Sequence, residues 1–193
     1  TDIVAETVNL SLSDTQSTGL NVSSTQSVNF TAGTTATLSL SDLSSVTAGD
    51  RANYTITRKD QYGNDSTSGS EIFYIYSSAT SGVHTFYDAA TNGNAITSIT
   101  IANGSSSAQF WYYDQNVASQ TITVSDNATA PDGATGIADA TDQITITPAV
   151  ISQVILSDAT STIAGNRVAY TITRKDQFGN FVNDGNNTIY LYS

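Results

Sequence analysis

The sequence predicts an all-β protein built of immunoglobulin-like antiparallel β-sandwich repeats. Three observations predict it: a composition poor in helix formers, an alternation of apolar and polar residues, and an internal duplication. Of the 193 residues, 30 are Thr and 26 are Ser, whereas Lys and Arg together number six. Ser and Thr are mediocre helix formers, and Thr is favoured in strands. This composition therefore disfavours a helical fold.

Apolar residues alternate with polar ones in several short runs, as half-buried strands require. In one run Tyr54 and Ile56 share a face, and in another Phe73 and Ile75 share a face. Clusters of Gly, Asn, Asp and Pro separate the runs, as turns do. In chain order, runs of this kind cover residues 54–57, 73–76, 99–101, 110–113, 122–124 and 144–146. About seven short strands in two packed sheets are expected.

An internal duplication divides the chain. Residues 41–77 align with residues 157–193 without a gap at an offset of 116, and 20 of the 37 aligned positions are identical. A weaker similarity links residues 9–14 to residues 121–126. A unit of this length matches one immunoglobulin-like sandwich. We therefore predict three parts: the terminal strands of an incomplete unit (1–33), one complete unit (34–150), and the first strands of another incomplete unit (151–193).

The motifs of the complete unit resemble a known family. In order they are Asp-Gln-Tyr-Gly-Asn at 60–64, an apolar run at 72–76, Ile-Thr-Ile-Ala-Asn-Gly at 99–104, Ala-Gln-Phe at 108–110 and Thr-Ile-Thr-Val at 121–124. This order resembles the bacterial immunoglobulin-like repeats of invasin and intimin type adhesins and of surface-layer proteins. The resemblance covers most of residues 38–147. It implies a tandem spacer or stalk at the cell exterior, without catalytic residues.

Residue content and net charge argue against several classes of function. The chain has no Cys and a single His, His84, so Cys nucleophiles and thiolate metal sites are absent and no catalytic constellation stands out. The formal net charge of −11 repels nucleic acid and anionic membranes, and no apolar run is long enough for membrane insertion. We expect a non-enzymatic protein. All six cations lie in the duplicated segments, where we expect them to face carboxylates.

The repeated turn is interpreted as structural. Asp60 would cap it, Gly63 would take a positive φ and Asn64 would tolerate one, and Asp176, Gly179 and Asn180 would do the same in the second copy. No cofactor is required by this interpretation. The alternative is a calcium site, because loop carboxylates supply the hard oxygen ligands that Ca²⁺ prefers. Its candidate ligands are Asp50, Asp60, Asp65, Asp126, Asp132, Asp139 and Asp142.

Aromatic residues mark candidate interaction surfaces. The run 110–113 places aromatics on both faces of one strand, so Trp111 and Tyr113 should lie outside the core. Such residues either pack against a neighbouring unit or stack on sugar rings. The same two interpretations apply to a predicted row of tyrosines on an outer sheet face, Tyr74, Tyr76, Tyr190 and Tyr192.

These observations predict a structural segment of an extracellular fibre, stalk or surface layer whose partners are neighbouring repeats or copies of itself. The incomplete units leave open sheet edges, so strands from elsewhere are expected to complete them. Residues 8–12 and 28–30 are natural donors to 151–193, which would build a head-to-tail filament. The alternative is a glycan-binding or calcium-binding accessory module of a secreted protein, with a cell-surface glycan as partner.

Overall fold

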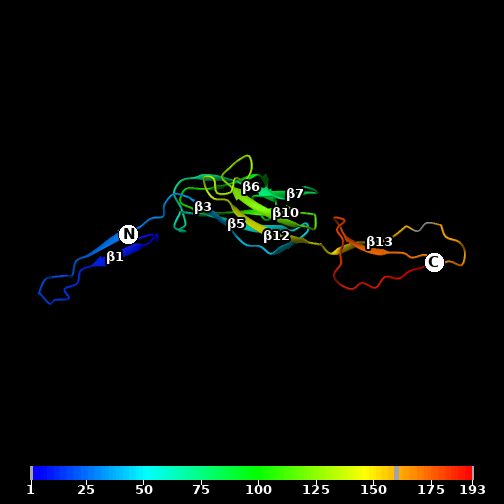
Figure 1. Cartoon of the computed structure of the whole chain (residues 1–193), viewed down its shortest axis with the longest axis horizontal. Coiled ribbons are helices and arrows are strands. Elements are labelled where there is room, and N and C mark those ends of the chain that lie inside the picture. Colours follow the sequence, from blue (N-terminus) through cyan, green and yellow to red (C-terminus); the bar gives the residue numbers. More distant parts are fainter. Residues whose placement is uncertain (1, 159–160, 193) are drawn as a thin grey trace.

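The computed structural model describes residues 2–158 and 161–192, and in that part it contains fourteen strands and no helix. The chain is elongated, with a central sandwich between two hairpins that lie at opposite ends (Figure 1). Among the described residues no helix has the length and hydropathy needed to cross a bilayer. The predicted all-β, immunoglobulin-like sandwich class is confirmed.

The central sandwich consists of two five-stranded sheets. The first has the order β3 (Thr37–Leu40), β5 (Arg51–Lys59), β10 (Ser107–Asp114), β7 (His84–Tyr87), β8 (Ala95–Ile96). The second has the order β4 (Ser45–Thr47), β12 (Ala140–Thr147), β11 (Ser119–Ser125), β6 (Glu71–Ser77), β9 (Ser98–Ile101). The unit thus has ten strands rather than about seven, because β3, β4, β7 and β8, which are two to four residues long, lie outside the predicted alternating runs. One pair, β4 with β12, is parallel.

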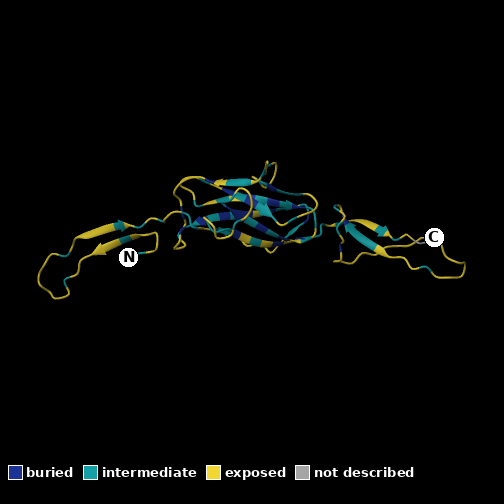
Figure 2. Cartoon of the chain, turned by 45° about the horizontal axis from the view of Figure 1, so that its top comes forward, coloured by how far each residue is buried: buried dark blue, intermediate teal, exposed yellow. Residues whose placement is uncertain are grey.

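The apolar core lies between these two sheets. Tyr54, Ile56, Phe110 and Tyr112 point into it from the first sheet and are fully buried, as the alternation predicts. Phe73 does the same from the second sheet. Tyr54 stacks on Phe110 with ring centroids 5.3 Å apart. Buried residues are concentrated in the central sandwich, whereas the two hairpins are mostly exposed (Figure 2).

The N-terminal hairpin reproduces part of the second sheet. Strands β1 (Thr7–Ser11) and β2 (Thr25–Asn29) pair with Val8 opposite Val28, the register in which Gln120 of β11 lies opposite Ile144 of β12. The weak sequence similarity therefore reflects a real structural correspondence. Leu10 is 54% exposed, although its counterpart Ile122 is fully buried. The hairpin has the pairing of a sandwich without the facing sheet.

The C-terminal hairpin reproduces part of the first sheet. Strands β13 (Ile151–Leu156) and β14 (Ile172–Asp176) pair with Val154 opposite Arg174, the register in which Leu38 of β3 lies opposite Arg58 of β5. Tyr170 is 55% exposed, although its counterpart Tyr54 is buried. Residues 187–192 form no strand, although their counterparts form β6, because the strands that flank β6 have no counterpart in residues 161–192.

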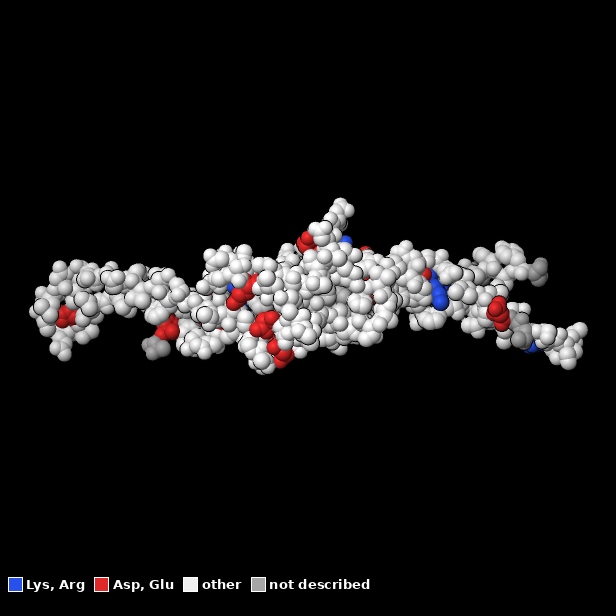
Figure 3. Space-filling model, turned by 90° about the horizontal axis from the view of Figure 1, so that it is seen from above, with Lys and Arg blue, Asp and Glu red and all other residues white. Residues whose placement is uncertain are grey.

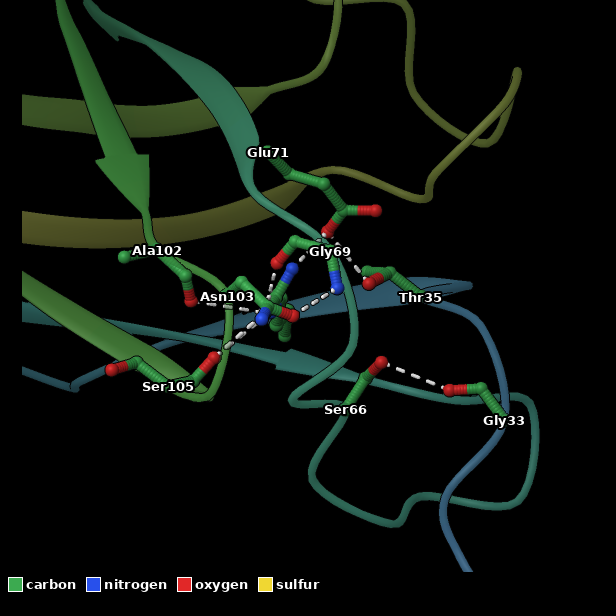
Figure 4. Close-up of polar contacts among 9 residues, drawn as sticks. Gly33, Thr35, Ser66, Gly69, Glu71, Ala102, Asn103 and Ser105 are labelled. Carbon is green, nitrogen blue, oxygen red and sulfur yellow. Dashed lines mark hydrogen bonds and ion pairs between the residues drawn. The ribbon is translucent and has the colours of Figure 1, made fainter.

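A buried arginine ties the loops at one end of the sandwich together. Arg58 is fully buried, and its Nη1 donates to Glu71 Oε2 at 2.9 Å. Its Nη2 donates to three carbonyl oxygens, those of Gly69 (2.9 Å), Ser105 (2.8 Å) and Ala102 (3.3 Å). Figure 4 shows the acceptors converging from separate loops. One side chain thereby satisfies backbone groups that strand pairing leaves open.

Only part of the expected pairing between cations and carboxylates is found. Lys59 pairs with Asp65 at 2.6 Å, beside the Arg58 pair. Arg51 instead lies over the Tyr87 ring, 3.5 Å from its centroid. In the second copy Arg174 donates to the amide oxygen of Asn187 at 2.8 Å, because Asn stands where the first copy has Glu71.

Arg58→Met is expected to lower the free energy of unfolding of the central sandwich by about 3 kcal/mol, because it removes a fully buried guanidinium whose partly buried hydrogen bonds hold three carbonyls and one carboxylate. Urea denaturation followed by tryptophan fluorescence measures the change. Arg174→Met is the matched control and should cost less than about 1 kcal/mol, since its hydrogen bonds are exposed and their acceptors can bind water instead. Equal losses in the two variants would contradict this account.

Candidate functional site

The repeated turn has the same backbone in both copies. In the first copy Asp60 Oδ1 accepts from the N–H groups of Tyr62 and Asn64, both at 2.9 Å, and Gly63 has a φ of 87°. In the second copy Asp176 Oδ1 accepts two equivalent bonds at 2.9 Å, and Gly179 has a φ of 88°. The capping role of Asp and the positive φ of Gly agree with the predicted geometry.

The second carboxylate oxygen of each Asp binds the chain segment that enters its unit. Asp60 Oδ2 accepts from the Gly33 N–H at 2.9 Å. Asp176 Oδ2 accepts from the Ala149 N–H at 3.0 Å. Gly33 and Ala149 occupy equivalent positions, 116 residues apart, in the linkers that precede β3 and β13. Each Asp therefore fixes both its own turn and the linker to the preceding unit.

Asn64 connects its turn to the preceding unit. The structure gives neither Asn64 nor its counterpart Asn180 a positive φ, which corrects the interpretation that Asn is there to tolerate one. Instead Asn64 Nδ2 donates to the Ile3 carbonyl at 2.8 Å, and its Oδ1 accepts from the Ala5 N–H at 2.9 Å. Its amide thus binds the N-terminal segment as a peptide group of a neighbouring strand would.

Asn180 makes the same pair of bonds at the other end of the central sandwich. Its Nδ2 donates to the Gln115 carbonyl at 2.8 Å, and its Oδ1 accepts from the Val117 N–H at 3.1 Å. Gln115 and Val117 precede β11, as Ile3 and Ala5 precede β1. The same junction is therefore present on both sides of the central sandwich. We call it the Asp–Asn junction.

The aromatic residue of the turn differs between the two junctions. Phe178 packs on Gly49, in the turn between β4 and β5, and contacts the core of the central sandwich. Tyr62, its counterpart, is 58% exposed. The difference arises because residues 2–33 contain no counterpart of the β4–β5 turn.

The hydrogen bonds of the Asp–Asn junction lower the pKa of its carboxylates. At Asp60 the side-chain bonds from Asn64 contribute most, followed by the Gly33 N–H, and they lower the pKa to about 2. At Asp176 burial raises the pKa, but the bonds from Asn180 and the Ala149 N–H outweigh it and the net shift is downward. Both groups therefore stay ionised wherever ordinary carboxylates do.

Three of the predicted calcium ligands lie together. Single carboxylate oxygens of Asp126, Asp132 and Asp139 lie within 4.8 Å of one another, in the loop that joins β11 to β12. Asp126 Oδ1 and Asp139 Oδ1 are buried without a hydrogen-bond partner. Both oxygens of Asp132 accept bonds, from Ser125 Oγ and Asn127 Nδ2. These three residues could hold a cation, and calcium binding stays a prediction.

The other predicted ligands are not part of that cluster. Asp60 is engaged in the Asp–Asn junction, and Asp65 pairs with Lys59. Asp142 Oδ2 accepts from Tyr54 Oη at 2.8 Å and from the Leu43 N–H at 3.2 Å. Asp50 is exposed in the turn before β5 and lies outside that cluster.

The predicted interaction aromatics fall into two groups. Trp111 and Tyr113 lie on the outer face of β10, where Tyr113 packs edge-on against Tyr87 at 6.2 Å between ring centroids. Tyr74 and Tyr76 lie on the outer face of β6, half-buried. Tyr190 and Tyr192 lie outside any strand, so the row of tyrosines predicted on one sheet does not form there. Binding of a glycan by Trp111 and Tyr113 stays a prediction.

The sequence matches no protein-family model. No curated protein matches it at a significant level.

Three solved structures illustrate what the chain resembles. Domains 4–9 of the surface-layer protein SbsC share 21% identity with a TM-score of 0.39, over 85% of this chain and 24% of that one. A β-glucuronidase from glycoside hydrolase family 2 shares 16% identity with a TM-score of 0.43, over 66% of this chain and 13% of that one. A CARDB domain of PF1109 from Pyrococcus furiosus shares 13% identity with a TM-score of 0.34, over 57% of this chain and 92% of that one. The chain thus spans a quarter or less of the first two.

Asn64→Ala is expected to raise the pKa of Asp60 from about 2 toward its ordinary value of 3.8, because the Asn64 side chain contributes most to the lowering. Titration of the side-chain carboxyl by NMR measures it. A pKa lowered by folding means that ionised Asp60 stabilises the junction above about pH 4, and this contribution is lost as the pH falls through about 2.

Gln61→Ala is the matched control, because Gln61 is an exposed member of the same turn and should leave the pKa of Asp60 unchanged. An Asp60 that titrates near 3.8 in the wild type, or that does not respond to Asn64→Ala, would contradict the assigned cause.

Proposed function

We propose that this chain is a non-enzymatic structural repeat segment of an extracellular surface protein, such as an adhesin stalk or a surface layer, in which sandwich units are coupled end to end. The observation that carries the proposal is the Asp–Asn junction, which occurs with the same atoms on both sides of the central sandwich. A contact that recurs at every boundary is what a tandem array requires. The extracellular assignment rests on the resemblance of residues 38–147 to bacterial surface repeats.

The junction couples the units by combining a short linker with two polar contacts. Only residues 148–150 separate β12 from β13, so the chain itself allows little separation between the units. Asp176 holds this linker at Ala149, and Asn180 holds the segment before β11. Because these two attachments lie on different segments of the preceding unit, together they oppose rotation as well as separation. The result is a semi-rigid rod, which matches the elongated arrangement in Figure 1.

The hairpins supply a second means of coupling, strand complementation between copies. Tyr170 and Val154 of the C-terminal hairpin are exposed, as is Leu10 of the N-terminal hairpin. Their counterparts Tyr54, Leu38 and Ile122 belong to one apolar core. Packing the N-terminal hairpin of one copy on the C-terminal hairpin of another would bring these apolar side chains against one another and remove part of their surface from water. Repetition of this contact gives an open head-to-tail chain.

Replacing both junction amides, in Asn64→Ala/Asn180→Ala, is expected to loosen the rod without unfolding the central sandwich. Small-angle X-ray scattering of the monomer should show a broader distance distribution, while the thermal transition of the sandwich shifts by about 4 °C or less. The control is Gln61→Ala/Gln177→Ala, which alters exposed members of the same two turns. A distance distribution equal to that of the wild type would refute coupling by these residues.

Leu10→Asp is expected to abolish concentration-dependent association, because it places a charge on the apolar face that the complementing hairpin must bury. Multi-angle light scattering over a dilution series measures the association. Ser11→Asp adds the same charge to the opposite face of β1 and should leave association intact. Association that survives Leu10→Asp would exclude this packing of the hairpins.

A further inference from the structure

The loop between β11 and β12 brings three carboxylates together without a counter-ion. Asp126, Asp132 and Asp139 each place one carboxylate oxygen within 4.8 Å of the other two, and we call them the three-Asp cluster. In the part of the chain that the structure describes, the Lys and Arg side chains form ion pairs only with Glu71 and Asp65. Like charges this close repel one another. A positive charge from outside the protein would remove this repulsion.

Two oxygens of the three-Asp cluster are buried without a hydrogen-bond partner. Asp126 Oδ1 and Asp139 Oδ1 are both shielded from solvent, and neither accepts a hydrogen bond from the described residues. A carboxylate oxygen in this position is costly, because it has lost its water without gaining a donor. His84 Nδ1 is the only other buried side-chain atom of this kind among the described residues. Two of the three such atoms thus belong to one cluster, and a shared cation would satisfy both.

The remaining oxygens of the cluster hold the carboxylates in place. Asp126 Oδ2 accepts from the Ile137 N–H at 3.1 Å, and Asp139 Oδ2 accepts from the Gly133 N–H at 2.8 Å. Both oxygens of Asp132 also accept hydrogen bonds from side chains at the end of β11. The three carboxylates are therefore oriented by the loop itself. Ligands that are already held lose little conformational freedom when an ion binds.

The equivalent loop of the N-terminal hairpin contains a single carboxylate and no cluster. Asp14 follows β1 as Asp126 follows β11, within the weak similarity between residues 9–14 and 121–126. Asp14 Oδ2 accepts from Thr18 Oγ1 and from the Gly19 N–H, both at 3.1 Å. Residues 15–24 contain no Asp or Glu. A carboxylate after this strand is therefore satisfied locally unless the loop supplies the other two.

We propose that Asp126, Asp132 and Asp139 bind one Ca²⁺ ion. Carboxylate oxygens are hard donors, which favour Ca²⁺ and Mg²⁺ over the softer metals that His and Cys bind. Oxygens that share a Ca²⁺ ion at about 2.4 Å lie up to about 4.8 Å apart, as the oxygens of this cluster do. Ca²⁺ accepts an irregular set of oxygens completed by water, whereas Mg²⁺ demands near-octahedral geometry. Three carboxylates on one irregular loop therefore suit Ca²⁺ better.

The position of the cluster gives the ion a role in holding the two sheets together. Asp126 directly follows β11 and Asp139 directly precedes β12, so a shared ion would join the two ends of the loop. Ala138, next to Asp139, accepts from the Leu38 N–H and donates to the Ala36 carbonyl, both at 3.0 Å. These bonds attach the start of β3, in the first sheet, to the loop of the second sheet. Ca²⁺ would thus stabilise the sandwich, because it binds the folded state.

The full chain, freed of metal with EDTA, is expected to bind one Ca²⁺ with a dissociation constant of about 1 mM or tighter. Isothermal titration calorimetry with CaCl₂ measures this. Asp139→Asn should weaken binding about tenfold or more, because it removes one of the three charges that hold the ion. Asn retains an oxygen that can accept from the Gly133 N–H, so this variant keeps the loop contact. Asp14→Asn, at the equivalent of position 126, is the matched control and should bind like the wild type.

Thermal unfolding provides a second readout. Ca²⁺ at about a hundred times its dissociation constant should raise the transition midpoint of the wild type by about 4 °C or more. The same Ca²⁺ should leave the midpoint of Asp126→Asn/Asp139→Asn unchanged. Circular dichroism without Ca²⁺ checks that this variant is folded, which is expected because Asn relieves the repulsion between carboxylates.

Three results would overturn the inference. If CaCl₂ gives neither a binding heat nor a shift of the midpoint in the wild type, the cluster is not a Ca²⁺ site. If Asp139→Asn binds as tightly as the wild type, the ion lies elsewhere. If MgCl₂ binds more tightly than CaCl₂, the assignment to Ca²⁺ is wrong. None of these results depends on how units are coupled or how copies associate.

Discussion

Each Asp–Asn junction depends on one carboxylate whose two oxygens bind different segments. In Asp60 one oxygen closes the turn after β5 and the other holds the linker at Gly33. Asp176 repeats this at Ala149. A shorter or neutral side chain could not satisfy donors on both sides, and the longer side chain of Glu would displace one set. The unit boundary therefore depends on the geometry of a single residue type.

The duplication allows two copies of the same segment to be compared, one inside a complete sandwich and one in an exposed hairpin. Arg58 is enclosed by loops of a complete sandwich, whereas Arg174 makes two of the equivalent bonds in a hairpin that lacks those loops. The turn, the strand register and the arginine contact are retained in the hairpin, but burial is not. Local hydrogen bonds are thus sufficient to pair the first strands of the unit. Burial of their apolar side chains requires packing against the second sheet. On the face shown in Figure 3, acidic side chains are scattered over a mostly uncharged surface.

The sequence predicted the features that depend on local pattern, namely which strand residues face the core and which turn residue has a positive φ. Alternation correctly placed Tyr54, Ile56 and Phe110 in the core, and the turn motif correctly gave Gly63 its positive φ. The junction role of Asn64 was missed because its partners lie more than 50 positions away and local propensity already explained an Asn there. The available signal was that both copies retain Asn at a position where the backbone does not demand it.

Loop carboxylates and sheet edges were less predictable. Asp126, Asp132 and Asp139 meet because one loop folds back on itself, and composition alone could not select these three from seven candidates. The short strands β4 and β8 depend on neighbours for their pairing and have too few residues to show alternation. Tyr190 failed to join a sheet because its flanking strands have no counterpart in residues 161–192.

The parallel pairing of β4 with β12 has a mechanical consequence for a stalk. Residues 45–47 come early in the chain path through the sandwich and pair with residues 145–147, where the chain leaves it. Tension applied at entry and exit would pull these strands in opposite directions along their length. Their hydrogen bonds, such as Thr145 N to Ser44 O at 3.1 Å and Ala48 N to Thr147 O at 2.8 Å, would then bear the load together in shear. A unit loaded in this way resists stretching more than one whose terminal strands peel apart bond by bond.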